Sequence, residues 1–201
     1  MYKKFIKRII DIVVSFIVVI ILSPVYLLIA IIIKIIDNGP IMYKQIRTGK
    51  EGNTFQIYKF RTMKNGNVTK LGKFLRMTSL DEIPQFYNVL KGDMSIVGPR
   101  PWIPDYYENF NENQKERTEV KPGLVGLAQV NGRRKINVFD KINYDIKYVK
   151  KVSLWLDLKI IIRSLKIIVT KQNISSEPNS YIKNEIEMLK NQQKDYEDKK
   201  I

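Results

Sequence analysis

The chain has 201 residues and a mass of 23.6 kDa, which is enough for one domain with its own core. It contains no Cys and no His, so disulfides, zinc sites with Cys or His ligands, His-dependent nucleophilic catalysis and His-bound haem are excluded. The formal net charge is +15, which favours an anionic partner such as a phosphate, a nucleic acid or an anionic membrane surface.

The first predicted element is an apolar helix over residues 12–33. These 22 residues carry no charge, and at about 1.5 Å per residue they are long enough to cross a hydrocarbon core of about 30 Å. Ser23 and Pro24 stand at the centre, where a proline removes one backbone hydrogen bond and favours a kink. The Ser23 hydroxyl is placed to bond the carbonyl group that Pro24 leaves unpaired.

Basic residues flank both ends of this apolar stretch. They are Lys3, Lys4, Lys7 and Arg8 before it, and Lys34, Lys44 and Arg47 after it. The positive-inside rule then places both ends on the cytoplasmic side of the membrane. A re-entrant helix that bends at Ser23-Pro24 and returns satisfies this rule, whereas a plain kinked span is the alternative. We assign residues 1–36 to this membrane helix.

Residues 37–62 predict a short β-hairpin. Strands are expected over residues 41–46 and 54–61, with a Gly-rich turn between them. Because side chains alternate along a strand, Lys59 and Arg61 would share one face. Two neighbouring cations can bind a phosphate oxyanion, although a solvated basic pair is the alternative.

Two adjacent carboxylates, Asp81 and Glu82, stand at the predicted start of a helix. Ser79 and Glu82 fit a capping box, and Asp81 as the cap would place Pro84 in the first turn. Either arrangement puts both carboxylates at a helix N-terminus, which favours their ionised form and attracts phosphate. The pair can bind Mg²⁺ and supply a nucleophile, or it can serve only to start the helix.

Two loops rich in Gly and Pro follow. Pro99 and Pro101 flank Arg100 and fix the backbone, which suits that arginine to clamp a diphosphate; a stiff surface loop with a solvated arginine is the alternative. Residues 121–133 combine glycines with side-chain amides that can face a nucleotide or sugar, but they match no P-loop and no dinucleotide fingerprint. The candidate ligand-binding residues there are Gln129, Asn131 and Arg133.

The last strong pattern is an amphipathic helix over residues 153–170. Its apolar positions recur at helical spacing: Leu154, Trp155, Leu158, Ile161, Ile162, Leu165, Ile168 and Val169. Trp together with basic residues suits the headgroup layer of a membrane, and packing on the core is the alternative. Residues 173–201 carry a net charge of −1 and are expected to form a polar, partly helical, solvated tail.

Over about residues 3–170, the order and spacing of six motifs resemble those of the bacterial sugar transferases, which are monotopic polyprenyl-phosphate phosphoglycosyl transferases. The motifs are Lys7-Arg8-x-x-Asp11, Ser23-Pro24, Lys59-Phe60-Arg61-Thr62-Met63, Leu80-Asp81-Glu82-Ile83-Pro84-Gln85, Val97-Gly98-Pro99-Arg100-Pro101, and Lys121-Pro122-Gly123 through Asn131-Gly132-Arg133.

The resemblance implies an α+β fold that is mainly helical with a small β-hairpin. A re-entrant membrane helix broken at Ser23-Pro24 would hold a catalytic domain of residues 37–172, with interfacial amphipathic helices, on the cytoplasmic face of the bacterial inner membrane. Lys7, Arg8 and Asp11 would mark where the membrane helix meets the globular part. The family transfers a sugar 1-phosphate from a UDP-sugar to undecaprenyl phosphate and releases UMP, as the first membrane step of glycan assembly.

Carried over residue by residue, the resemblance makes Asp81 the nucleophile that forms a covalent phosphosugar intermediate. Glu82 would position Mg²⁺ or handle a proton, with Asp81 and Glu82 as the metal ligands. Lys59, Arg61 and Arg100 would bind phosphate. Gln129, Asn131 and Arg133 would contact the nucleotide or sugar, and Arg134 departs from the asparagine that relatives often have there, which leaves the sugar open.

A competing class is a non-catalytic basic membrane-surface protein that binds anionic lipid or nucleic acid. It explains the positive charge and the amphipathic helix, but not the Asp81-Glu82 pair or the rigid arginine between two prolines. We therefore expect UDP-sugar, undecaprenyl phosphate and membrane lipids as partners and no nucleic acid. A bitopic membrane scaffold is the third alternative, which topology distinguishes from the re-entrant form.

Overall fold

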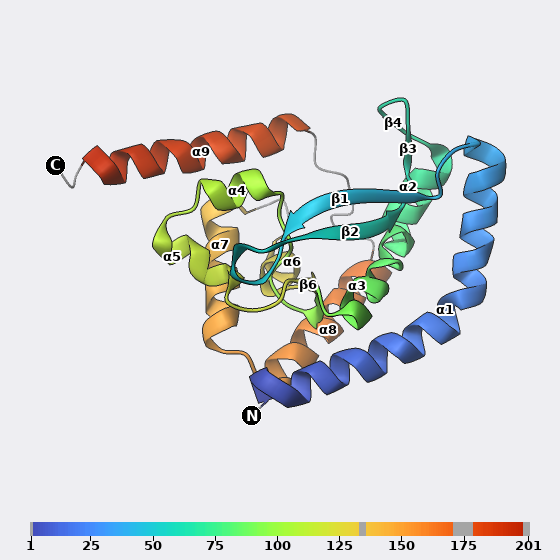
Figure 1. The fold of residues 1–201 in the computed structure, drawn as a ribbon, viewed down its shortest axis with the longest axis horizontal. Coiled ribbons are helices and arrows are strands. Elements are labelled where there is room, and N and C mark those ends of the chain that lie inside the picture. Colours follow the sequence, from blue (N-terminus) through green and yellow to red (C-terminus); the bar gives the residue numbers. More distant parts are fainter. Residues whose placement is uncertain (1, 133–135, 171–178, 199–201) are drawn as a thin grey trace.

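The structure is a computed structural model, and it describes residues 2–132, 136–170 and 179–198. These residues are mainly helical, as expected (Figure 1). The longer helices are α1 (Lys7–Asp37), α2 (Lys70–Thr78), α3 (Gln85–Lys91), α7 (Val138–Lys150), α8 (Leu154–Val169) and α9 (Asn179–Asp198). The short ones are α4 (Pro104–Glu108), α5 (Glu112–Lys115), α6 (Leu127–Asn131), a π-helical turn η1 (Tyr2–Ile6), and the 3-10 turns η2 (Lys50–Gly52), η3 (Leu80–Glu82) and η4 (Glu116–Thr118).

The β-structure is limited to pairs of short strands. The predicted hairpin is confirmed as β1 (Met42–Thr48) paired antiparallel with β2 (Thr54–Phe60), with Met42 opposite Phe60. A second small hairpin joins β3 (Met63–Lys64) to β4 (Asn67–Val68), and β5 (Ser95–Val97) pairs in parallel with β6 (Gly123–Val125). The outer edge of β2 is covered by α3, because the Asn88 side chain accepts from the Tyr58 amide and donates to the Gln56 carbonyl.

Helix α1 contains Pro24 and changes direction about halfway along its length (Figure 1). The expected hydrogen bond of Ser23 is confirmed, since its Oγ donates to the carbonyl oxygen of Ile20 at 2.8 Å. Ile20 is the residue whose carbonyl a proline at position 24 leaves without its helical donor. The helix ends at Asn38, which adopts the left-handed conformation (φ 43°) before Gly39 and Pro40.

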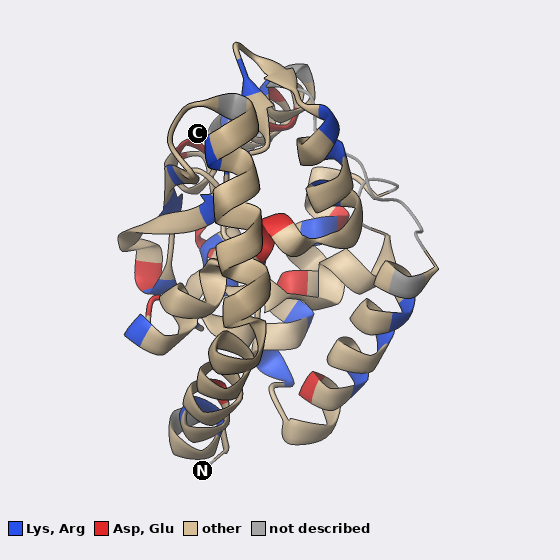
Figure 2. Cartoon of the chain, turned by 90° about the vertical axis from the view of Figure 1, so that its right-hand side faces the viewer, with Lys and Arg blue, Asp and Glu red and all other residues tan. Residues whose placement is uncertain are grey.

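Most apolar side chains of α1 face outward. By length and composition, α1 is long and apolar enough to cross a membrane, and it is the one such helix in the described part of the chain. Figure 2 shows that its central part carries no charged residues. Near its C-terminal end, Ile29, Ala30 and Ile33 are buried in a cluster with Phe60, Leu75 and Ile83. An exposed apolar face of this size is uncommon on soluble proteins and is typical of a surface that contacts lipid or another protein.

The start of α1 is fixed to the rest of the chain by polar contacts. Lys7 Nζ lies 2.6 Å from Asp157 Oδ2 in α8, and Arg8 donates to the carbonyl groups of Val89 and Leu90 at the end of α3. The buried Asp11 carboxylate accepts from the Ile96 amide at 3.0 Å. The prediction that these three residues mark the junction with the globular part is confirmed.

Helix α8 presents three faces instead of the single apolar stripe expected. Asp157, Ile160 and Ser164 are buried against the rest of the chain. A second face exposes large apolar side chains, namely Leu154, Trp155, Leu158, Ile162 and Leu165, with Trp155 83% exposed. The third face carries Lys159, Arg163 and Lys166, which are exposed and form the basic row visible on this helix in Figure 2. One face therefore packs on the rest of the chain, as the alternative interpretation expected, and the location of the exposed faces in the headgroup layer stays a prediction.

The expectation of a solvated C-terminal tail is wrong for α9. Leu189 is 1% exposed and packs in a cluster with Trp102, Phe110, Val138 and Ile142. The buried Glu185 carboxylate accepts from Tyr106 Oη at 2.7 Å and from Lys141 Nζ at 2.8 Å. Helix α9 therefore docks on α4 and α7 through both apolar and charged contacts. The division of the chain after residues 36 and 172 stays a prediction.

Candidate active site

The two carboxylates of the candidate site lie in the 3-10 turn η3, between α2 and α3. Ser79 ends α2 in the left-handed conformation, with φ at 59°, and its side chain makes no capping hydrogen bond. Pro84 is the residue that precedes α3, and no side chain caps that helix. Both capping arrangements expected from the sequence are therefore wrong, although Asp81 and Glu82 do lie in the first turn of a short helix. The left-handed conformation of Ser79 changes the direction of the chain two residues before Asp81.

Glu82 is held by two cations. Its Oε1 atom lies 2.6 Å from Lys59 Nζ, at the end of β2, and 3.2 Å from Arg100 Nη2 in the loop after β5. Burial alone would raise the pKa of the Glu82 carboxyl, but Lys59 and Arg100 overcome this effect and hold that pKa well below its ordinary value. Glu82 is therefore ionised at neutral pH.

Asp81 stands beside this ion-pair cluster in a different environment. Its side chain is buried, with the residue 9% exposed. Burial and then the neighbouring Glu82 charge raise the pKa of Asp81 to about 6, against the smaller opposing effects of Lys59 and Arg100. Two consecutive carboxylates whose pKa values move in opposite directions are typical of sites where acidic groups divide two roles.

One basic residue near Asp81 was missed in the sequence. Arg76, in the last turn of α2, is close enough to lower the pKa of Asp81 electrostatically. Its Nε donates to Thr62 Oγ1 at 2.9 Å, which fixes the side chain against the segment that follows β2. The only sequence signal was its position five residues before Asp81. This spacing does not place Arg76 near Asp81 unless the left-handed turn at Ser79 is known.

The structure separates the two cations that the hairpin pattern grouped. Lys59 reaches Glu82, but β2 ends at Phe60 and the Arg61 guanidinium lies against Gly39 instead. A Cβ atom on Gly39 would come within 2.1 Å of Arg61 Nη1, so a larger residue there would require the Arg61 side chain to move. Among the described residues, the ion pairs of Glu82 come from Lys59 and Arg100 and not from Arg61.

The Gly-rich segment after residue 121 is largely used within the fold. Gly98 and Gly123 pack backbone against backbone, and the Gly123 amide donates to the Pro99 carbonyl at 2.9 Å. In α6, Gln129 Nε2 donates to Leu124 O at 3.4 Å and Asn131 Nδ2 donates to Leu127 O at 2.8 Å. No contact joins these two amides to the acidic pair in the described chain, and Arg133 and Arg134 lie outside the described residues.

A metal ion at this site would have few protein ligands. No group of three or more acidic side chains that could hold a metal occurs among the residues that the structure describes. Asp81 and Glu82 are two adjacent carboxylates, and one Glu82 oxygen already contacts both cations. This donor set fits Mg²⁺, which commonly uses one or two carboxylates together with substrate phosphates and water.

The combination of groups suits reaction at a phosphorus atom. Lys59 and Arg100 supply positive charge at one carboxylate, and the side chain of Arg100 is 41% exposed, so it can reach a ligand. The neighbouring Asp81 is buried, and its pKa is raised to about 6, so it is mostly ionised at neutral pH in spite of its burial. A cationic site beside a desolvated carboxylate can bind a phosphate group and present a nucleophile to it.

Comparison with known proteins identifies one family. The family described as "Bacterial sugar transferase" matches residues 2–171. The "Galactosyl transferase CpsE" of Streptococcus agalactiae serotype III is 43% identical over 159 residues, which is 66% of this chain and 35% of that protein. The "UDP-glucose:undecaprenyl-phosphate glucose-1-phosphate transferase" of Klebsiella pneumoniae is 44% identical over 177 residues, which is 77% of this chain and 38% of that protein.

A shorter relative aligns over most of both chains. The "Uncharacterized sugar transferase EpsL" of Bacillus subtilis is 38% identical over 180 residues, which is 84% of this chain and 89% of that protein. In contrast, the chain spans little more than a third of the length of the CpsE and Klebsiella proteins. The shared part contains both the apolar helix and the acidic pair, since the family match begins at residue 2 and ends at residue 171.

Proposed function

Because the chain belongs to the bacterial sugar transferase family, we propose that it transfers a sugar 1-phosphate from a UDP-sugar to undecaprenyl phosphate and releases UMP. The observation that carries the proposal is the buried Asp81 beside Glu82, whose charge is paired with Lys59 and Arg100. The Klebsiella relative is named for UDP-glucose and undecaprenyl phosphate, and CpsE is named for galactose. The substrate class is thus proposed from these names, and the sugar is left open.

In the first proposed step, a carboxylate oxygen of Asp81 attacks the β-phosphorus of the UDP-sugar. A bond forms between that oxygen and phosphorus, and the bond from phosphorus to the oxygen that bridges the two phosphates breaks. UMP leaves with the bridging oxygen, and Asp81 carries the phosphosugar. The pKa of Asp81 is about 6, so most of this side chain is ionised at a pH above that value. A partly desolvated carboxylate is also more reactive than a hydrated one.

In the second proposed step, a phosphate oxygen of undecaprenyl phosphate attacks the same phosphorus atom. The new bond makes a lipid-linked diphosphosugar, and the bond between phosphorus and Asp81 breaks. The electron pair returns to Asp81 and restores its carboxylate, so the residue is ready for another cycle. Two displacements on one nucleophile predict ping-pong kinetics.

We assign Glu82 a positioning role, not a proton-transfer role. Its pKa is held well below the ordinary range by Lys59 and Arg100, so it would not take up a proton at neutral pH. Its charge instead keeps the Lys59 ammonium and the Arg100 guanidinium beside Asp81. Both cations would then lie where the diphosphate of the donor must bind. Mg²⁺ held by Asp81 and Glu82 would offset the diphosphate charge and stabilise the departing UMP.

We also propose that α1 is a re-entrant membrane helix and that the site faces the cytoplasm. Its bend, the internal Pro24 and the Ser23 hydrogen bond support a helix that turns back. The exposed apolar and basic faces of α8 would lie in the headgroup layer of the same leaflet. Such a position brings a soluble nucleotide sugar and a lipid phosphate to one site.

The test is UMP release by the purified protein with Mg²⁺, undecaprenyl phosphate and a panel of UDP-sugars. We expect release with one or a few donors, and Asp81→Asn to abolish it while the variant still binds membranes. Asp105→Asn, at an exposed aspartate of α4, is the matched control. Without the lipid acceptor, mass spectrometry should find the phosphosugar on Asp81. Wild-type turnover by Asp81→Asn would overturn the assignment of the nucleophile.

A further inference from the structure

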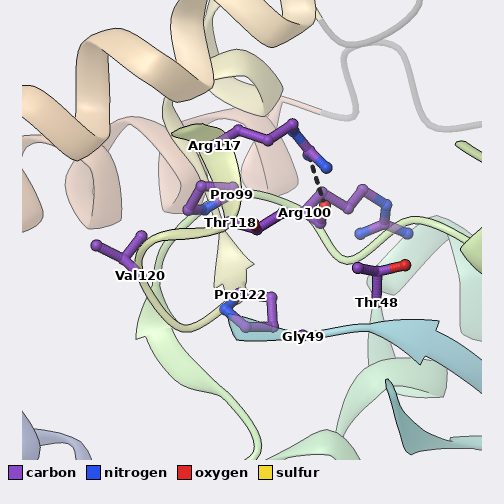
Figure 3. Close-up of a pocket in the computed structure, with 8 residues that line it drawn as sticks. All are labelled: Thr48, Gly49, Pro99, Arg100, Arg117, Thr118, Val120 and Pro122. Atoms are coloured by element: carbon purple, nitrogen blue, oxygen red, sulfur yellow. Dashed lines mark hydrogen bonds between the residues drawn. The ribbon is translucent and has the colours of Figure 1, made fainter. Parts of the chain in front are cut away.

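The loop that carries Arg100 is held from behind by a buried arginine, Arg117 of η4. Arg117 is 3% exposed, and its Nη2 donates to the backbone carbonyl of Arg100 at 2.9 Å. Figure 3 shows this contact, with the side chain of Arg100 pointing away from Arg117. The buried guanidinium of Arg117 thus holds the backbone of Arg100, while the guanidinium of Arg100 is directed to Glu82.

Each carbonyl group from residue 99 to residue 102 accepts a hydrogen bond from a different donor. The pairs are Pro99 with the Gly123 amide, Arg100 with Arg117 Nη2, Pro101 with Arg47 Nη1, and Trp102 with the Thr48 amide. Because Pro99 and Pro101 have no N–H group, the loop depends on these carbonyl contacts for its position. Of these four hydrogen bonds, the one from Arg117 holds the residue whose own side chain contacts Glu82.

Arg117 is itself fixed by two further contacts. Its Nε and Nη2 donate to Asp145 Oδ2 in α7, at 3.1 and 2.6 Å, and its guanidinium lies 3.9 Å from the centre of the Trp102 ring. A planar guanidinium can bridge a carboxylate and a carbonyl in a fixed geometry, which an ammonium cannot do. A buried ion pair of this kind is weak evidence for stability alone, so the bridge to Arg100 suggests a role in the site.

We propose that Arg117 is a positioning residue that directs the Arg100 guanidinium to Glu82. The proposal rests on the proposed transferase function for its effect on turnover, but not for the geometry it predicts. Arg117 has no contact with Glu82 or Asp81 among the described residues, so it acts through the backbone of Arg100. Loss of the bridge lets the loop shift, and a shift of about 1 Å in a group that binds the reacting phosphate can cost about 100-fold in rate.

The kinetic test compares Arg117→Lys in two backgrounds. The lysine keeps a charge for Asp145 but cannot span Asp145 and the Arg100 carbonyl together. We expect kcat/KM for the UDP-sugar to fall about 10- to 100-fold in the otherwise unchanged protein. In an Arg100→Ala background the same substitution should change kcat/KM less than about 2-fold, because its route of action is gone. Equal losses in both backgrounds would overturn the proposal.

A matched control removes a second buried ion pair that does not touch the loop. Lys141 and Glu185 form this pair between α7 and α9, and the control variant is Lys141→Met with Glu185→Leu. The corresponding variant at the bridge, Arg117→Met with Asp145→Leu, avoids leaving a single buried charge. We expect only the second double variant to lose kcat/KM. A similar loss in both would assign the effect to general packing and overturn the proposal.

A structure of Arg117→Lys tests the geometry without any activity. We expect the distance between Arg100 Nη2 and Glu82 Oε1, 3.2 Å here, to exceed ion-pair range in the variant. If that contact persists unchanged, the positioning role is wrong. If the wild-type protein releases UMP from no UDP-sugar, the proposed function fails. The comparison of the Arg100–Glu82 distance in the two structures still decides the positioning role of Arg117.

Discussion

The Nζ atom of Lys59 lies 2.6 Å from Oε1 of Glu82, so the cation at the end of β2 pairs with the second carboxylate of the acidic pair. Arg100 reaches the same oxygen at 3.2 Å. Asp81, one residue earlier, is buried beside this cluster and has a raised pKa of about 6. The asymmetry supports Glu82 as a fixed charge that holds two cations and Asp81 as the group that reacts.

The pH dependence of turnover should follow Asp81. Burial, and then the Glu82 charge, raise the pKa of Asp81 to about 6, and only the ionised carboxylate is a nucleophile. We expect kcat/KM to be constant above this pH and to fall about 10-fold for each unit below it. Initial rates of UMP release across about pH 5 to 8 measure the profile.

Two comparisons make this pH prediction specific. A cation bound beside Asp81 favours its ionised form, so the fall should move to lower pH when the Mg²⁺ concentration is raised. Glu82 should contribute no step in the neutral range, because its pKa is held well below the ordinary value. A profile that is flat through pH 6 at low Mg²⁺ would contradict the role of Asp81.

Asp81→Asn should stabilise the fold at neutral pH while it removes activity. The folded-state pKa of about 6 lies above the ordinary value of 3.8, so between these two values the folded state binds more protons than the unfolded state. The free energy of unfolding therefore decreases as pH rises from about 4 to about 6, by up to about 3 kcal/mol for this one group. We expect a higher Tm for the variant at pH 7.5 and little difference at pH 4.

The matched control for this stability test is Asp105→Asn at an exposed position. That variant should change Tm little at either pH, because its carboxylate is solvated in both states. A lower Tm for Asp81→Asn at neutral pH would show that its carboxylate forms stabilising contacts, and would contradict the burial argument.

Lys59→Met tests whether the Lys59 ammonium keeps Glu82 ionised and helps to bind the donor diphosphate. The substitution leaves Glu82 with Arg100 alone, so the Glu82 pKa should rise and the donor diphosphate should lose one positive partner. We expect kcat/KM to fall about 10- to 100-fold, as for other lost charge-assisted contacts. Lys44→Met, an exposed lysine on the neighbouring strand β1, is the control, and equal losses in the two variants would argue for an effect of net charge only.

Patterns with a local cause were predicted well from the sequence. The charge-free stretch gives α1, Ser23 is three residues from the carbonyl that Pro24 frees, and Gly-rich turns bound the hairpin. The acidic pair was placed at a helix start from its local spacing, and its catalytic role came from the resemblance of the motif Leu80-Asp81-Glu82-Ile83-Pro84-Gln85 to the family. These features depend on side chains within a few residues of one another, and such spacings are visible in the sequence.

Features that depend on tertiary contacts were missed or wrong. The capping box of Ser79 with Glu82 and the alternative cap at Asp81 were both wrong, since Ser79 adopts a left-handed conformation that propensity does not predict and no side chain caps η3 or α3. Arg61 was grouped with Lys59 on the alternation of side chains along a strand, but its guanidinium lies against Gly39, whereas Lys59 pairs with Glu82. The role of Arg117 needs α7 and the loop at residue 100 to meet, and the distances of 17 and 28 residues along the chain leave no trace in a motif.

The re-entrant form of α1 predicts that both of its flanks lie on one side of the membrane. The chain has no Cys, so Lys3→Cys and Lys64→Cys each introduce one exposed thiol. We expect an impermeant thiol reagent to label both from the cytoplasmic side. Labelling from opposite sides would support a bitopic span and contradict the re-entrant helix.

A second pair of variants tests why the helix turns back. Pro24→Ala restores an amide donor to the Ile20 carbonyl, which now bonds Ser23 at 2.8 Å, and so favours a straight helix that crosses the membrane. In this variant the thiol at position 3 should become accessible from the outside. Leu28→Ala, at an exposed position of the same helix, should leave the labelling unchanged.

Helix α9 should add to stability through one buried leucine. Leu189 is 1% exposed among Trp102, Phe110 and Ile142, so Leu189→Ala should destabilise the fold by about 2–4 kcal/mol, from lost burial and the cavity left behind. Met188 is its neighbour but is 51% exposed, and Met188→Ala should cost less than about 0.5 kcal/mol. Urea unfolding of the two variants measures the difference, and equal midpoints would mean that α9 does not dock on α4 and α7 in solution.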